Sequence, residues 1–523
     1  MRNRHRNPNR FAQQVLPLLL LGIGLVASNN YLTFVDDEVR TLDAAAQPVH
    51  TLFARFFSGC GPQNMPALYT VVLHFWLRWT AGNFQYLRVP AIIFFLAGLW
   101  LLALAARRLG SQASGITMLW LGILWPYGFH YGRLAAPYSF VFFLIAGLTF
   151  AYLQLLEKES FGRWCALFLF GAALLWTNFF GWAVVACLGI DQLIRRRAGE
   201  PAMSVRAMGR TAILWIAVCI PVFRPLYREF IAGANIHNGF RAAITSCAYY
   251  IYTLFVSESV APWHWQLSVP AGLAILVCIV LVSMQPSWPA RRFLAYGAVL
   301  VILMAAAGIL FSPQLVFVAP WVLLPIAVAI GSIKSRWAQP VLAVMLLIIA
   351  GVGWTGIYAR QYYSAPQFLE PWVQEAGDVA GKIQTGATVI SNSRPFFLYL
   401  TYVLRPPTRS PGAGFEGFFP DSIHQPSVNS ANQWLSSGHP MAPVMIWIHG
   451  VSDPQAEKPM EDAAHELDRS CGSRVSRLMS RDQGYEWKQR FLPEIAGAQW
   501  RIEVREYDCG PNSSQEIFPI PAH

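Results

Sequence analysis

Three consecutive carboxylates, Asp36, Asp37 and Glu38, follow the first apolar segment of the chain. A carboxylate can take the proton from an attacking hydroxyl or amine, and paired carboxylates are the groups that work at glycosidic bonds. Acidic residues next to a bilayer are costly and are functional candidates by default. The alternative is structural: an Asp at this place commonly caps a short solvated helix.

The composition indicates the kind of protein that positions this acidic run. Of the 523 residues, 55% are hydrophobic and only 13% are charged, which is typical of a polytopic membrane protein. The net charge of +11 comes from basic clusters in short loops between apolar segments, as expected on the cytoplasmic side. Because no basic face with interleaved aromatic residues occurs, nucleic-acid binding is not expected.

The fold class predicted is an all-α polytopic membrane protein with a small C-terminal α/β domain. Segments of suitable length and apolarity predict about eleven transmembrane helices, the first at 11–30 and the last at 341–358. The N-terminus is expected to be cytoplasmic, and the first helix to be an uncleaved anchor that delivers the acidic run to the outside. Residues 66–81 are expected to lie in the interface as an amphipathic helix, and 224–266 to form a long external loop.

The second domain predicted follows the membrane domain of residues 1–360. From 361 to 523 the composition becomes that of a soluble, extracytoplasmic domain. Helices are predicted at 371–382, 395–403 and 459–467, and strands at 387–392, 444–449 and 500–507, a pattern typical of a small α/β layer. Cys471 and Cys509 both lie in this domain and could pair there, and the sequence leaves that pairing open.

Several short motifs occur in a fixed order in the membrane part of the chain. After the acidic run come Asn-Met-Pro-Ala-Leu-Tyr at 64–69 and Arg-Val-Pro at 88–90. This order resembles that of the GT-C glycosyltransferases of the protein O-mannosyltransferase and aminoarabinose-transferase type. Their acidic pair falls on Asp37 and Glu38, and their second motif matches Pro66, Leu68 and Tyr69.

A third stretch, 131–138, resembles the external Tyr-x-x-Glu-Ala-Arg-x-Tyr segment of that superfamily. Leu134 and Ala136 stand where the Glu and Arg would be. Arg133 lies one helical turn before Ala136, so its guanidinium could take the place of the missing one. The tip of a predicted hairpin, 178–181, resembles another motif of the superfamily without its His.

The resemblance implies a transferase that moves a sugar from a polyprenyl phosphate to an extracytoplasmic lipid, glycan or protein acceptor at a bacterial inner membrane. Asp37 would be the base, and Glu38 or Asp36 would orient the acceptor or stabilise the charge on the sugar. Arg133 and Arg88 would bind the donor phosphate, since guanidinium groups bind phosphate oxygens in bidentate fashion. Tyr138 and Tyr69 are further candidates for substrate contact; interfacial anchoring is the alternative for all four.

No cofactor and no metal site are expected, because no histidine pair has ligand spacing and no Cys-x-x-Cys occurs. A divalent cation between Asp36, Asp37 and the donor phosphate stays open. Two other functions also stay open. A flippase or transporter of lipid-linked saccharides would need charged residues near the middle of its spans, and a non-catalytic subunit would explain the replaced motif residues.

Overall fold

The computed structural model describes most of the chain, which forms two compact units. The described residues are 8–29, 33–58, 67–233, 240–284, 288–332, 337–359, 371–404, 428–438, 441–449, 454–481, 485–491 and 501–510. The first unit comprises Met1–Asn30, Pro48–Trp76 and Gln85–Tyr362, and the second comprises Tyr31–Gln47, Leu77–Phe84 and Tyr363–His523.

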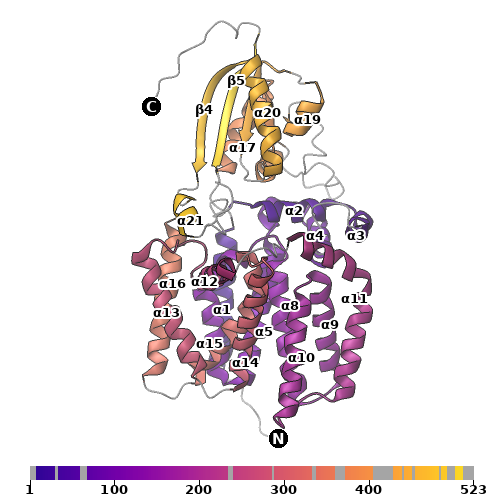
Figure 1. Ribbon diagram of the computed structural model, residues 1–523, viewed down its shortest axis with the longest axis vertical. Coiled ribbons are helices and arrows are strands. Elements are labelled where there is room, and N and C mark those ends of the chain that lie inside the picture. The colour runs from indigo at the N-terminus through magenta and orange to yellow at the C-terminus, as the bar shows by residue number, and fades with distance from the viewer. Residues whose placement is uncertain are drawn as a thin grey trace. The chain divides into compact units, whose positions relative to one another are not determined.

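Helices make up the first unit, and many of them run alongside one another (Figure 1). They are α1 (Pro8–Ala27), α3 (Val49–Ser58), α5 (Val89–Leu109), α6 (Gln112–Leu124), α7 (Pro126–Tyr131), α8 (Tyr138–Glu157), α9 (Phe161–Thr177), α10 (Gly181–Arg197), α11 (Val205–Gly233), α12 (Phe240–Val256), α13 (Trp265–Ser283), α14 (Trp288–Ala306), η2 (Ser312–Phe317), α15 (Ala319–Ser332) and α16 (Ala338–Tyr358). Two further elements, α4 (Ala67–Trp79) and η1 (Phe84–Tyr86), carry residues of both units.

The lengths and apolarity of these helices fit a helical, multi-pass membrane protein. Among the described residues, six helices are long and apolar enough to cross a bilayer, and four apolar helices are shorter. The count of about eleven spans stays a prediction. The expectation of an irregular loop at 224–266 is wrong, because α11 continues to Gly233 and α12 occupies Phe240–Val256.

Close helix packing inside the first unit depends on small residues. At Gly98 of α5, an added Cβ would lie 2.6 Å from a ring carbon of Phe142 on α8. Glycine at this position therefore lets two apolar spans approach closely, which increases their van der Waals contact.

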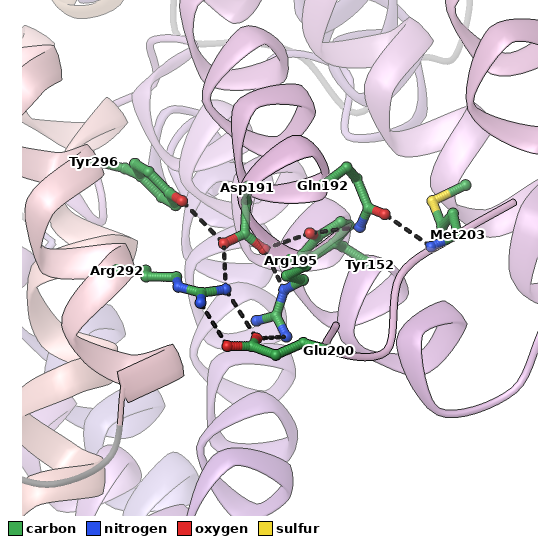
Figure 2. A network of polar contacts seen from close by, with 8 residues as sticks. All are labelled: Tyr152, Asp191, Gln192, Arg195, Glu200, Met203, Arg292 and Tyr296. Carbon is green, nitrogen blue, oxygen red and sulfur yellow. Dashed lines mark hydrogen bonds and ion pairs between the residues drawn. The ribbon is translucent and has the colours of Figure 1, made fainter. Parts of the chain in front are cut away.

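A buried polar network joins α8, α10 and α14 near one end of the first unit (Figure 2). The carboxylate of Asp191 accepts hydrogen bonds from Tyr152 at 2.5 Å and Tyr296 at 2.9 Å. It also pairs with Arg195 at 2.5 Å and Arg292 at 3.4 Å. Glu200 pairs with both arginines, at 3.3 and 2.7 Å. Each buried charge thus has a partner of opposite sign, which a low-dielectric site requires.

The second unit is a five-stranded mixed sheet with flanking helices. Its elements are α2 (Asp36–Ala46), α17 (Trp372–Gln384), β1 (Thr388–Ser391), α18 (Arg394–Leu404), β2 (Val428–Asn429), α19 (Ala431–Ser436), β3 (Val444–His449), α20 (Pro454–Ser470), β4 (Gly472–Arg481), α21 (Tyr485–Phe491) and β5 (Arg501–Asp508). The strand order is β2-β1-β3-β5-β4, with β1 parallel to β2 and β3, and β5 antiparallel to β3 and β4. The predicted strands and helices of this domain are all present, and the structure adds β2, α19, β4 and α21.

One face of this sheet is packed against α19 and α20. Trp447 of β3, Trp434 of α19 and Tyr507 of β5 are buried there with Met460 and Leu467 of α20. The Trp447 indole N–H donates to the carbonyl of Met460 at 2.8 Å. Alternate residues of β3 therefore point to opposite faces, as the period of a strand requires.

A disulfide joins Cys471 to Cys509, which lie 38 residues apart. The disulfide lowers the conformational entropy of the unfolded chain. We therefore expect the Cys471→Ser, Cys509→Ser double variant to lose about 3 to 4 kcal/mol of domain stability. Thermal unfolding followed by tryptophan fluorescence would measure the loss. Cys247→Ser, a change at a half-buried free cysteine, is the control. Equal unfolding temperatures for all three proteins would contradict the expectation.

Glu375 of α17 is a buried acid, with 1% of its surface exposed. Its carboxylate lies 3.8 Å from Arg477, which also pairs with Glu506 at 3.1 Å. Burial raises the pKa of Glu375, although Arg477 opposes the shift. The folded state therefore holds this proton better than the unfolded state. The stability that results is fully present below the unfolded pKa and is lost as the pH rises through the folded pKa.

Glu375→Leu is expected to leave the domain as stable as the natural one or more stable at pH 7, by about 1 to 4 kcal/mol at most. The reason is that an apolar side chain removes a buried charge while Arg477 keeps Glu506. The difference should shrink as the pH falls toward 4 in a series of thermal unfolding curves. Glu461→Leu, an exposed position on α20, controls for the added leucine. A clear loss of stability at pH 7 would contradict this account.

Candidate active site

The acidic run opens helix α2 in the second unit. Val35 precedes the helix in an extended conformation, and the Glu38 carboxylate accepts a hydrogen bond from the Val35 N–H at 3.2 Å. A carboxylate at this third helical position satisfies an N–H that the helix itself leaves unpaired. Three acids in the first turn also suit the positive end of the helix dipole.

The three carboxylates have different surroundings. Glu38 is fully buried, Asp36 is half-buried and Asp37 is exposed. Asp36 forms an ion pair with Arg40, one turn further along α2. Burial raises the pKa of Asp36, while Arg40 and Arg394 oppose that shift. Of the three predicted acids, Asp37 is therefore the most exposed to solvent.

Helix α18 of the C-terminal domain packs against α2, a contact that the sequence did not indicate. The Phe34 N–H, just before α2, donates to the Tyr399 hydroxyl at 2.9 Å. The Phe84 ring lies 4.9 Å from that of Phe34 and 5.3 Å from that of Tyr399. These aromatic contacts fix the start of α2, so Tyr399 is a positioning residue for the acids that sequence reasoning missed.

Arg88 and Arg133 both lie in the first unit and are fully buried. An Arg88 nitrogen donates to the carbonyl of Asn29 at 2.6 Å. An Arg133 nitrogen donates to the Ser28 carbonyl at 2.6 Å and to its hydroxyl at 2.8 Å. The two guanidinium groups thus stabilise the carbonyl end of α1, where cations are favoured. The structure brings them to one place, seven residues before the acidic run begins.

The 131–138 stretch holds a second buried carboxylate. The Tyr131 hydroxyl donates to one oxygen of Glu258 at 2.6 Å, and the Ser312 hydroxyl donates to the other at 2.6 Å. Glu258 lies in the loop after α12 and is 7% exposed. It fixes Tyr131 and hence the turn that carries Arg133. A lone Glu between serines gives no sequence signal, which is why this residue was missed.

The two predicted tyrosines make aromatic contacts in the structure, and their role in substrate binding stays a prediction. Tyr69 of α4 is fully buried, with its ring 5.9 Å from that of Phe140. Tyr138 opens α8 and its ring meets that of Tyr131 edge-on at 6.0 Å. Asn64, Met65 and Pro66 of the second motif lie outside the described residues. The hairpin tip predicted at 178–180 is present: the Asn178 side chain accepts from the Phe180 N–H at 2.9 Å between α9 and α10.

The part of the chain that the structure describes contains no cluster of metal ligands. No group of three or more His, Cys, Asp or Glu side chains there could hold an ion. That the protein needs neither metal nor cofactor stays a prediction.

Comparison with known proteins identifies the fold. No protein-family model and no curated protein matches the sequence. The crystal structure of ArnT from Cupriavidus metallidurans bound to undecaprenyl phosphate is similar, with a TM-score of 0.52 and 11% identity over 95% of this chain and 98% of that one. The apo structure of the same protein gives a TM-score of 0.53 and 11% identity over 94% and 97%. The chain therefore has the ArnT fold, which confirms the aminoarabinose-transferase resemblance at that level.

Proposed function

We propose that this protein is a membrane glycosyltransferase that moves a sugar from a polyprenyl-phosphate donor to an extracytoplasmic acceptor. The observation that carries the proposal is the likeness to ArnT along nearly the whole chain. One of those structures holds undecaprenyl phosphate, a lipid of the proposed donor class. The acidic run at the expected place in the motif order adds support.

In the proposed reaction Asp37 is the general base. It takes the proton from the acceptor hydroxyl or amine as that atom attacks the anomeric carbon. The bond from the anomeric carbon to the phosphate oxygen breaks, and the polyprenyl phosphate leaves with the electron pair. Asp36 and Glu38 would orient the acceptor or stabilise positive charge on the sugar ring. Attack opposite the leaving group inverts the anomeric configuration.

Arg133 and Arg88 are proposed to bind the phosphate of the donor, with Tyr138 and Tyr69 as neighbouring contacts. Buried guanidinium groups suit phosphate oxygens in charge and in shape. The second unit is proposed to lie outside a bacterial inner membrane and to help bind the acceptor. The Cys471–Cys509 disulfide supports that compartment, because such bonds persist in oxidising surroundings.

Membranes that contain the full chain provide the test. They are incubated with a panel of labelled polyprenyl-phosphate sugars, and the released polyprenyl phosphate is quantified by mass spectrometry. Release above that from membranes lacking the chain supports the transferase. If the lipid-linked sugar crosses the bilayer intact, the protein is a flippase. If neither event occurs with any donor, a non-catalytic subunit is the better account.

A further inference from the structure

An apolar cavity opens between α10 and α11 in the first unit, on the side where Figure 1 shows α9, α10 and α11 close together. It has a volume of about 250 Å³ and is backed by Leu167 of α9. Trp182 and Gln192 mark the two ends of its α10 wall. The exposed residues Ala212 and Ile216 lie at its α11 wall, so the cavity is open to the surroundings of the helices.

Most polar side chains on the wall of this cavity are hydrogen-bonded within the protein, although the buried indole N–H of Trp182 has no hydrogen-bond partner among the described residues. Gln192 donates to the Tyr152 hydroxyl at 2.6 Å and accepts from the Met203 N–H at 2.8 Å (Figure 2). The Trp215 indole donates to a carbonyl of α9 at 3.0 Å, and Thr211 accepts from an indole of α9 at 2.8 Å. The cavity therefore suits a hydrocarbon chain, and water would find few partners in it.

The length of the cavity indicates what kind of hydrocarbon chain would fit it. From Trp182 to Gln192, α10 rises by about 15 Å. The hydrocarbon core of a bilayer is about 30 Å thick, so this is the depth of one leaflet. Residues Val205–Pro225 of α11 are a candidate membrane span. Ile213 and Ile220 are exposed on this helix, as residues in contact with lipid would be. An opening at this side would lead directly into lipid tails.

A second cavity, of about 590 Å³, adjoins the first at Met203. It lies by the first turns of α9 and α11, and Glu159, Ser160 and Arg210 are the polar residues of a lining that is otherwise mostly apolar. The Glu159 carboxylate accepts a hydrogen bond from the Ser204 N–H at 2.6 Å. Arg210 gives it a cation where the phosphate of a lipid would lie, and Ser160 gives it a hydroxyl donor. The first cavity and the cavity that contains Arg210 are thus arranged like the tail and the headgroup of one lipid.

We propose that these two cavities bind one bilayer phospholipid, with an acyl chain between α10 and α11 and its phosphate at Arg210. The site lies at the end of the unit that carries the Asp191 network and does not involve the acidic run. It makes no use of sugar transfer, so it stands or falls independently of the proposed function.

Two glycines offer a matched pair of variants. Gly189 lines the apolar cavity, and an added Cβ there meets nothing within 4 Å. Gly209 of α11 is also half-buried and equally open, but it does not line either cavity. Gly189→Leu should therefore fill the cavity without a clash, and Gly209→Leu repeats the same change outside it.

Acyl-chain photolabelling tests the site. The purified full-length protein is placed in nanodiscs of phosphatidylglycerol that contain some phosphatidylglycerol with a diazirine on its chain, and labelled peptides are mapped after illumination. We expect labelling to concentrate on Trp182, Val185 and Trp215, to fall several-fold in Gly189→Leu, and to stay unchanged in Gly209→Leu. Arg210→Gln should also lower it when labelled lipid is scarce.

Three results would overturn the proposal. Labelling that falls mainly on Ile220, an exposed residue of α11 that lines neither cavity, would mean ordinary contact with the bilayer. Cavity labelling that Gly189→Leu leaves intact would place the chain elsewhere. Displacement of the label by an equimolar amount of undecaprenyl phosphate would make the occupant a polyprenyl lipid instead. Both glycine variants are first checked for natural unfolding temperatures, so that a loss of label reports on the cavity.

Discussion

Replacing Asp37 with Asn is expected to lower the rate of sugar transfer by about 10²- to 10⁴-fold, the usual contribution of a general base. Asn keeps the size of the side chain but cannot accept the proton. Because Asp37 is exposed at the first turn of α2, the change should leave the fold intact. The rate is measured in membranes as polyprenyl phosphate released per unit of protein, at matched protein levels.

Variants of the other carboxylates of α2 separate the loss of a base from damage to the helix. Asp43 lies on the same helix outside the acidic run, so Asp43→Asn should leave the rate nearly unchanged. Glu38→Gln removes the charge but keeps an oxygen that can accept the hydrogen bond from the Val35 N–H. Glu38→Ala removes both the charge and this hydrogen bond at the start of α2. If Asp37→Asn transferred sugar as fast as Asp43→Asn, Asp37 could not be the base.

Replacing Asp191 with Asn should cost about 3 to 5 kcal/mol of stability, the usual effect of breaking a buried ion pair. Asp191 is 1% exposed and accepts from four side chains, so its loss leaves Arg195 and Arg292 short of negative charge. Thermal unfolding of the purified protein in detergent would show the change. Tyr296→Phe, which removes one neutral donor, should cost only about 1 kcal/mol.

A double-variant cycle separates the ion pair from general damage. Arg292→Gln alone leaves Glu200 and Asp191 with less positive charge. When it is combined with Asp191→Asn, the losses should not add, because the second change removes a carboxylate that the first left with Arg195 as its remaining ion-pair partner. Strict additivity would mean that the two side chains do not interact. An unchanged unfolding temperature in Asp191→Asn would contradict the role of the network altogether.

Much of the fold was predictable because apolar runs and periodicity report directly on helices and strands. The domain strands at 388–391, 444–449 and 501–508 coincide with runs that contain β-branched or aromatic residues. The edge strand β4 was missed, since its sequence Gly-Ser-Arg-Val-Ser-Arg-Leu-Met-Ser-Arg has no alternating apolar face. The predicted span that corresponds to α11 ended at Phe223, where Arg224 and Pro225 interrupt the apolar run, whereas the helix continues to Gly233.

The candidate site was predictable only in part. The acidic run was found because consecutive carboxylates are rare beside a bilayer. Its place in the first turn of α2 is what the capping alternative also expects, so the catalytic role stays a prediction. Tyr399 and Glu258 were missed because their roles depend on contacts between segments far apart in the chain. Arg88 and Arg133 were chosen for their charge. The structure adds that both hold the end of α1, which the sequence could not indicate.

The most direct test of the central claim is a single-turnover reaction with purified protein. The protein, in excess, is mixed with a polyprenyl-phosphate sugar that its membranes consume and with an acceptor, and both products are followed by mass spectrometry. Polyprenyl phosphate and glycosylated acceptor should appear in equal amounts, with inverted anomeric configuration, and neither should form with Asp37→Asn. Equal product formation by Asp37→Asn, or a product of retained configuration, would contradict the mechanism.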